Sequence, residues 1–366
     1  MTKIELRKVS KSFFGTKALD NVSFTIRSGD FVSILGSANA GKSTLLRIIA
    51  GTVKPDKGEI FFDDVDVTKL PAQKRNVGVI FQTFALYPNM SVYENIASPL
   101  RTKKMAKDDI DKRVKETADL LRITDLLEKS PYELSGGEAQ RSALARALVK
   151  DAAVYLLDEP LTNLDYKLRE SMKIELKEIL QIKKTTILYA TPSPEEALVL
   201  TDRMIFLDQG RVTQTGPVKE CYKAPVNINA GTHYSSPPMN LIDAKAISKN
   251  GKSFLAIEDK LELEATHLNL PSGEQEYVVG VYPHEILLTS EKKDMIKIPV
   301  NVELQEFAGS EMTVRLRWNQ ANLTMYVPYL KSLDEKISVH IDPEDLYIFS
   351  KKTGNLILKY KKGKKR

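Results

Sequence analysis

Apolar residues follow two patterns in the first part of this chain. Short apolar runs at 31–35, 154–157 and 186–189 are typical of buried strands. The run at 31–35 leads through a glycine turn to apolar residues at 45–49, and the stop at Gly51 predicts that these form a helix. This order predicts an α/β fold in which helices flank a mostly parallel sheet, accompanied by an antiparallel β portion.

A charged segment interrupts this alternation at 100–130. Its apolar residues recur at helical spacing, so we predict a helical insertion at about 85–150. The residues expected on its buried face are Ile110, Val114, Ala118 and Leu121.

A proline-rich seam at Ser235–Asn240 predicts a domain boundary. Beyond it, alternating runs at 277–281 and 312–316 predict the strands of small β-barrels. We therefore expect an α/β domain at 1–235 and an all-β domain at 236–366.

The composition is that of a globular protein. The chain has 366 residues, of which 42% are hydrophobic and 28% charged, and no apolar run reaches membrane-spanning length. We find no signal peptide and expect the chain to stay in the cytoplasm, reaching a membrane only through a partner. Cys221 is the single cysteine, which excludes an internal disulfide and favours a structural thiol.

The net charge of +6 owes much to the tail, Lys359–Arg366. Such a run is typical of a solvated, disordered end. Binding to an anionic membrane face or to nucleic acid is the alternative.

A phosphate-binding loop is predicted between the first buried strand and its helix. Residues Gly36–Ser43 fit the pattern G-x-x-x-x-G-K-[ST], in which backbone N–H groups and a helix N-terminus favour phosphate. Lys42 is expected to reach the β- and γ-phosphates of ATP, and Ser43 to bind Mg²⁺. The predicted ATP-binding residues here are Gly36, Ser37, Ala38, Asn39, Ala40, Gly41, Lys42, Ser43 and Thr44.

Two acids end the buried strand at 154–157. Open α/β sheets place their ligands at such strand ends. Asp158 is expected to hold the Mg²⁺ shell, and Glu159 to polarise the attacking water. Beside a phosphate-binding loop, this pair predicts ATP hydrolysis.

The stretch Leu134–Arg141 reads as a second phosphate-binding turn, but it carries no lysine. Together with the loop above, it resembles the signature of the ABC (ATP-binding cassette) ATPases. The resemblance implies that Ser135, Gly136 and Gly137 close over ATP held by a second chain.

Further positions match the same family in order along residues 1–235. Phe81-Gln82 resembles the Q-loop, which implies that Gln82 senses the γ-phosphate, the metal and a permease. Thr162–Asp165 resembles the D-loop at the dimer interface, with Asp165 near the nucleotide. Phe13 stands where the family stacks an aromatic ring on adenine, with Phe14 as the alternative.

The rest of the chain resembles the maltose- and glycerol-phosphate-type importer ATPases, which carry OB-like (TOBE-type) regulatory barrels. The matching stretches are Ser236–Asn240 and Val281–Glu285, although Tyr282 replaces the family's arginine. The resemblance implies a peripheral location at the cytoplasmic face of the membrane. It also implies an indirect link to a periplasmic or extracellular solute-binding protein, and no nucleic-acid partner.

The implied permease contact lies in the Gln82–Asn95 region. Phe84–Pro88 and Val92–Asn95 would form the groove that grips a permease helix. Their apolar and aromatic side chains fit a buried core equally well.

Two departures affect the nucleotide site of this chain. Where the family has Thr-His-Asp after a strand, the sequence has Thr191-Pro192-Ser193, and proline offers no donor to the γ-phosphate. Ala38-Asn39 replaces Ser-Gly, and asparagine tolerates a positive φ better than other non-glycine residues. All the histidines lie at or beyond the end of the nucleotide domain: His233, His267, His284 and His340.

These departures favour an asymmetric dimer with a second, related ATPase that keeps its histidine. A homodimer in which Ser193, Thr191 or water replaces the missing contact is an alternative. A subunit that holds ATP without useful hydrolysis is another, although Glu159 argues against it. An ABC protein acting on nucleic acid or ribosomes is a further class, but its usual second cassette, coiled coil or zinc motif is absent from the sequence.

Overall fold

The computed structural model describes residues 2–361, apart from 81–85, 163, 184, 269, 271–275, 291, 293, 308, 310 and 329–331. The chain divides into two compact units, Met1–Val218 and Lys219–Arg366. The seam at Ser235–Asn240 therefore falls inside the second unit, and the division comes earlier in the chain than the predicted boundary.

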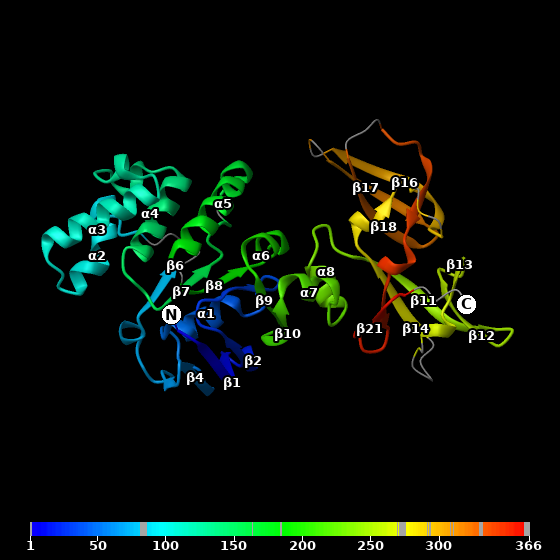
Figure 1. The fold of residues 1–366 in the computed structure, drawn as a ribbon, viewed down its shortest axis with the longest axis horizontal. Coiled ribbons are helices and arrows are strands. Elements are labelled where there is room, and N and C mark those ends of the chain that lie inside the picture. Colours follow the sequence, from blue (N-terminus) through cyan, green and yellow to red (C-terminus); the bar gives the residue numbers. More distant parts are fainter. Residues whose placement is uncertain are drawn as a thin grey trace. The chain divides into compact units, whose positions relative to one another are not determined.

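The central sheet of the first unit is parallel except for one edge strand (Figure 1). Its order is β10 (Arg211–Pro217), β9 (Arg203–Asp208), β3 (Phe31–Leu35), β8 (Thr186–Thr191), β7 (Val154–Asp158) and β6 (Val77–Ile80). Only β10 pairs antiparallel in this sheet. The three predicted strands and the mostly parallel sheet are confirmed.

A second, antiparallel sheet completes this unit, in the order β2 (Thr16–Ile26), β1 (Ile4–Phe13), β4 (Lys57–Phe62) and β5 (Val65–Asp66). Helix α1 (Lys42–Ala50) packs against both sheets, since Leu45 shares one core with Leu6 of β1 and Leu156 of β7. The helix ends as predicted at Gly51, whose φ of 82° is left-handed.

The predicted helical insertion is present and gathers to one side of the unit (Figure 1). It contains α2 (Val92–Thr102), α3 (Lys107–Leu120) and α4 (Gly136–Leu148). The predicted apolar face is buried in a core that also holds Tyr155 and Leu157 of β7. Helices α5 (Tyr166–Lys183) and α6 (Pro194–Leu200) complete the unit. No helix in the described part of the chain is both long and apolar enough to cross a bilayer.

The second unit begins with two short helices and is otherwise built of strands. The helices are α7 (Val218–Lys223) and α8 (Ile228–His233). One sheet has the order β13 (Leu261–Glu264), β12 (Lys252–Ile257), β11 (Asn240–Lys249), β14 (Glu276–Val281), β20 (Tyr347–Ser350) and β21 (Leu356–Lys359). The other has the order β15 (Ile286–Leu287), β19 (Lys336–Ile341), β16 (Ile296–Phe307), β17 (Glu311–Trp318) and β18 (Ala321–Pro328). The two sheets share one hydrophobic core, so the expected all-β, barrel-like architecture is confirmed.

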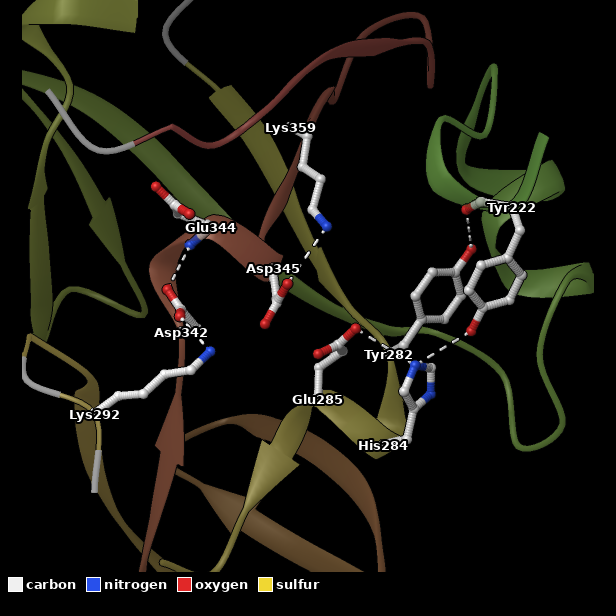
Figure 2. Close-up of polar contacts among 9 residues, drawn as sticks. All are labelled: Tyr222, Tyr282, His284, Glu285, Lys292, Asp342, Glu344, Asp345 and Lys359. Carbon is white, nitrogen blue, oxygen red and sulfur yellow. Dashed lines mark hydrogen bonds and ion pairs between the residues drawn. The ribbon is translucent and has the colours of Figure 1, made fainter. Parts of the chain in front are cut away.

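Tyr282, which replaces the family's arginine, has a clear packing role in this unit (Figure 2). Its fully buried ring stacks on Tyr222 of α7, with the centroids 4.6 Å apart and the planes 12° from parallel. Its hydroxyl donates to the carbonyl oxygen of Tyr222 at 3.3 Å. His284 stacks on the same ring at 5.6 Å. This aromatic stack joins α7 to the all-β part.

Tyr282→Ala should lower the free energy of unfolding of the second unit by about 3–5 kcal/mol, because it removes a buried ring. Tyr282→Phe keeps the ring and should lower it by only about 1 kcal/mol. Urea denaturation followed by tyrosine fluorescence measures both changes. Tyr132→Ala is the control, since Tyr132 is exposed. Equal stability of the Tyr282→Ala and Tyr132→Ala variants would contradict this role.

Candidate nucleotide site

The loop between β3 and α1 has the conformation that a phosphate cradle requires. Asn39 has a φ of 65°, which confirms the reason inferred for asparagine there, and Gly41 has a φ of 103°. A Cβ atom at Gly36 would lie 2.2 Å from the carbonyl oxygen of Leu207, and one at Gly41 would lie 2.4 Å from that of Ala18. Glycine is therefore required at both ends of the loop.

A cavity of about 420 Å³ opens above this loop. It is lined by Thr16, Lys17, Ala18, Ala38, Asn39, Gly41, Lys42, Ser43, Thr44 and Glu159. The cavity thus brings together most of the predicted loop residues and the predicted catalytic acid.

Lys42 is buried at the base of this cavity and makes three polar contacts. Its Nζ donates to the carbonyl oxygens of Gly36 and Ser37, at 3.0 Å each, and lies 3.1 Å from Oε1 of Glu159. Phosphate oxygens would compete with Glu159 for this ammonium group. Glu159 has a φ of 47°, a left-handed conformation that costs about 1–3 kcal/mol and is typical of functional sites.

Ser43 and Asp158 form the oxygen pair predicted to hold a metal. The hydroxyl of Ser43 donates to Oδ1 of Asp158 at 2.9 Å. Burial raises the pKa of Asp158 above its ordinary value, while this hydrogen bond acts in the opposite sense. Adjacent ligands in an octahedral Mg²⁺ shell lie about 2.9 Å apart, so the pair fits such an ion.

The signature residues do not line this cavity. Ser135 is exposed and caps α4: its hydroxyl accepts from the backbone N–H of Glu138 at 3.4 Å. The backbone N–H of Ser135 donates to the Glu138 carboxylate at 2.7 Å. Asp165 is also exposed and accepts from the backbone N–H of Leu168 at 2.9 Å, near the start of α5. The signature serine and the D-loop aspartate thus cap the starts of helices and do not line the cavity of their own chain.

The two signature glycines have different reasons to be glycine. A Cβ atom at Gly137 would lie 2.4 Å from Leu168, whereas one at Gly136 would meet no described residue outside its own turn of helix within 4 Å. Packing against Leu168 therefore excludes a larger side chain at Gly137. Packing within the described residues does not exclude one at Gly136.

Gly136→Ala should keep or raise the thermal stability, by up to about 1 kcal/mol, because alanine favours a helix more than glycine does. Gly137→Ala should lower it by about 1 kcal/mol or more, because Leu168 must move. Thermal unfolding of the two variants measures the difference. If Gly136→Ala lowered the stability, another part of the chain would occupy the space beside Gly136, which would contradict this prediction.

Comparison with known proteins agrees with this geometry. A family model described as ABC transporter matches residues 19–162. The sn-glycerol-3-phosphate import ATP-binding protein UgpC 1 of Rhizobium etli is 34% identical over 358 residues, which are 97% of this chain and 98% of that protein. UgpC of Escherichia coli (strain K12) is 33% identical over 360 residues, covering 98% of this chain and 100% of that protein. The chain belongs to the ABC transporter ATP-binding proteins. As a member of this family, it binds ATP and is an ATPase.

Solved structures of related cassettes match the first unit. The dimeric post-hydrolysis state of the ATP-binding cassette MJ0796, bound to ADP and Pi, has a TM-score of 0.54 and 31% identity, and covers 59% of this chain and 98% of that one. A structure of cbiO1 from Clostridium perfringens, part of the transporter complex cbiONQ, has a TM-score of 0.55 and 29% identity, and covers 60% of this chain and 90% of that one. The ABC ATPase fold is therefore established for this part of the chain.

The switch loop of this ABC ATPase is built without a donor at Pro192, which is exposed. The fully buried hydroxyl of Thr191 donates to the Glu196 carboxylate at 2.6 Å and accepts from the backbone N–H of Ser193 at 3.0 Å. The hydroxyl of Ser193 caps α6 by accepting from the N–H of Glu196 at 3.3 Å. The two hydroxyls proposed to replace the missing histidine are therefore already hydrogen-bonded to Glu196. Glu196 was not identified from the sequence.

The two residues predicted to stack on adenine are both exposed. Phe13 ends β1, is 41% exposed, and has Nζ of Lys11 5.3 Å from its ring centroid. It pairs with Thr16, which lines the cavity. Phe14 is fully exposed with a φ of 49°. Stacking of Phe13 on adenine stays a prediction.

The predicted permease groove is described only in part. Four residues named for this region lie outside the described residues: Phe81, Gln82, Phe84 and Ala85. Asn163 of the D-loop lies outside them as well. Tyr87 is 51% exposed, as a groove residue should be, and the guanidinium of Arg146 lies 5.2 Å from its ring centroid.

Val92 and Asn95 are fully buried, so their assignment to the groove surface is wrong. Val92 belongs to the helical core. The Asn95 amide accepts from the N–H of Tyr87 and donates to the carbonyl oxygens of Tyr87, Met90 and Ser91. Asn95 thus holds the segment that carries Tyr87. Arg146 was missed because nothing in its local sequence indicates a distant aromatic partner.

Proposed function

We propose that this chain is the ATP-hydrolysing subunit of an ABC importer and that it couples ATP to uptake of a sugar, polyol or glycerol-type solute. The observation that carries this proposal is the similarity, over nearly the whole chain, to proteins named as sn-glycerol-3-phosphate import ATP-binding proteins. Among the solutes of this class, the names of these relatives favour glycerol 3-phosphate. The chain would act at the cytoplasmic face of the membrane, bound to permease subunits that receive solute from a binding protein.

Disruption of the gene in its own host tests this role. Uptake of radiolabelled glycerol, sn-glycerol 3-phosphate and maltose would be measured in cells with and without the chain. Loss of uptake of one of these solutes, restored by the wild-type gene and not by Ser135→Arg, is the expected result. Unchanged uptake of all three would contradict the solute class.

Within the nucleotide site, we propose that Ser43, Asp158 and Gln82 hold Mg²⁺ and that Lys42 binds the β- and γ-phosphates. The metal would neutralise phosphate charge, and Glu159 would accept a proton from the attacking water once phosphates draw Lys42 away. The 2.9 Å Ser43–Asp158 contact and the 3.1 Å Lys42–Glu159 contact support these roles.

We propose further that two ATPase chains form each working pair, with ATP between them. Ser135 and Gly136 are exposed, rigidly capped and absent from the cavity of their own chain, which supports their presentation to ATP on a partner. Because Pro192 replaces the histidine, the donor to the γ-phosphate is lost only at the ATP site that contains this chain's own phosphate-binding loop. The partner is therefore expected to be a second, related ATPase with an intact switch loop.

The homodimer remains the second candidate. Turnover by this chain alone, without a histidine-bearing partner, distinguishes the two. We expect that the purified chain hydrolyses ATP poorly.

Permease movement is proposed to reach the signature through helix α4. This helix carries Ser135 at its N-terminus and, in its last turn, Arg146 against the exposed ring of Tyr87. A permease helix that moves Tyr87 would therefore move the rigid helix that presents the signature.

Arg146→Ala should weaken the stimulation of ATP turnover by permease and solute by about 2- to 30-fold, the range of ordinary coupling energies. Turnover of the complex in membrane vesicles, with and without solute, measures this effect. Arg113→Ala is the matched control, because Arg113 lies on α3 and pairs with Asp151 at the surface. An equal loss in both variants, or none in Arg146→Ala, would contradict the coupling path.

A further inference from the structure

A basic cavity in the second unit has no role in the nucleotide site. It has a volume of about 550 Å³ and lies beside strands β16, β17 and β19. Three exposed lysines line it, Lys260, Lys297 and Lys336, and none of the described residues in its wall is acidic. Its volume is that of a small-molecule site.

The positive charge that lines this cavity is less balanced by acidic residues than in two other cavities of the unit. A second cavity of about 550 Å³ is lined by arginines, but each of these faces a glutamate: Arg315 lies 3.5 Å from Glu306, and Arg317 lies 2.9 Å from Glu303. A third, of about 380 Å³, mixes lysines with four acidic residues. Lys260 lines this third cavity as well, whereas Lys297 and Lys336 do not. None of these three lysines forms an ion pair within the described part of the chain. Three unpaired ammonium groups around one cavity repel each other, and a bound anion would relieve that repulsion.

The remaining lining residues narrow the chemistry of the anion. Lysine is a compact point charge that suits a phosphate group, and the one lining guanidinium, Arg317, is already paired with Glu303. The amides of Asn301 and Asn319 provide donors and acceptors for hydroxyl groups. Part of the wall is apolar, formed by Pro299 and neighbouring side chains. A phosphate with a short polyhydroxylated body matches all three features.

The strand register places these groups side by side. Lys336 of β19 and Arg317 of β17 both pair with Asn301 of β16. Lys297 lies four residues before Asn301 on β16, so both are on the same face of the sheet. The positive charges are thus spread along the cavity and are not gathered at one point, which suits an elongated ligand.

We propose that this cavity binds a phosphorylated polyhydroxy metabolite, such as a sugar phosphate, through Lys260, Lys297 and Lys336. The site gives the all-β unit a small-molecule input of its own, separate from the nucleotide. The proposal does not depend on the solute or on the subunit partner of the transporter.

Isothermal titration calorimetry on the full chain tests this site, with the nucleotide cavity saturated by a non-hydrolysable ATP analogue and Mg²⁺. Glucose 6-phosphate is the probe, and glucose, inorganic phosphate and phosphatidylglycerol vesicles are the comparisons. We expect saturable binding of glucose 6-phosphate, weaker binding of inorganic phosphate and none of glucose.

Two double variants with the same change in net charge assign the binding to the cavity. Lys297→Gln/Lys336→Gln should weaken binding by about tenfold or more, because two charged contacts are lost. Lys249→Gln/Lys252→Gln should leave it unchanged, because those lysines pair with Glu262 and Glu264 outside the cavity. Lys297→Arg/Lys336→Arg should keep most of the affinity.

Four results would overturn the proposal: no saturable binding of glucose 6-phosphate, binding of vesicles alone, inorganic phosphate binding as tightly as glucose 6-phosphate, or equal weakening in the two glutamine variants.

Discussion

Pro192→His is expected to raise ATP turnover by the purified chain by about 10²-fold. One preorganised donor at a developing charge is worth about 10²–10³ in rate. The Lys42–Glu159 and Ser43–Asp158 contacts of the site are in place. Pro192 is exposed at the end of β8, so a histidine there has room. The Thr191 and Ser193 hydroxyls are bound to Glu196 and cannot supply the missing donor without disturbing α6. Steady-state release of phosphate measures the gain.

Pro192→Ala is the control, because it removes the proline ring and adds no side-chain donor. It should leave turnover near the wild-type value. If alanine raised turnover as much as histidine, the defect would lie in the stiffness of the proline and not in the missing donor. Robust turnover by the wild-type chain, with no gain from histidine, would contradict the account of a damaged site.

Ser135→Arg is expected to lower turnover of the assembled transporter by at least about 10²-fold. The reason is that Ser135 is presented outward by the cap of α4 and would serve ATP held by the other ATPase. Lys42→Ala removes the phosphate contact of the impaired site, so it should cost the same complex less than about tenfold. Both variants would be assembled with the wild-type partner and permeases, and phosphate release would be measured.

Tyr132→Arg is a matched control for added charge near the signature, because Tyr132 is exposed three residues before Ser135. It should leave turnover intact. The opposite order of effects, with Lys42→Ala abolishing turnover and Ser135→Arg leaving it, would mean that this chain's own site drives transport.

Much of this site could be predicted from the sequence because its chemistry is local. The loop Gly36–Ser43 needs glycines and a positive φ at fixed positions, and the structure has both. The acids that end β7 follow from the same local logic, because a buried parallel strand ends at the ligand edge of the sheet. The apolar spacing of α3 likewise predicted its buried face.

Contacts between distant parts of the chain could not be predicted. Arg146 lies against the ring of Tyr87 although the two are far apart in the sequence, and no local pattern marks the pair. The burial of Val92 and Asn95 depends on how α2 packs, since residues in the first turn of a helix fit a groove or a core equally well. The Lys42–Glu159 ion pair joins two motifs that the sequence identified separately. The early division of the chain at Val218 reflects the packing of α7 through Tyr222 and Tyr282, which only the fold reveals.

We propose that this chain works in a pair with a different ATPase. The most direct measurement is affinity purification of the tagged chain from detergent-solubilised membranes of its host, followed by native mass spectrometry of the complex. The account predicts one copy of this chain together with one related ATPase that keeps the switch histidine, and the permease subunits. A complex that contains two copies of this chain and no other ATPase would contradict it.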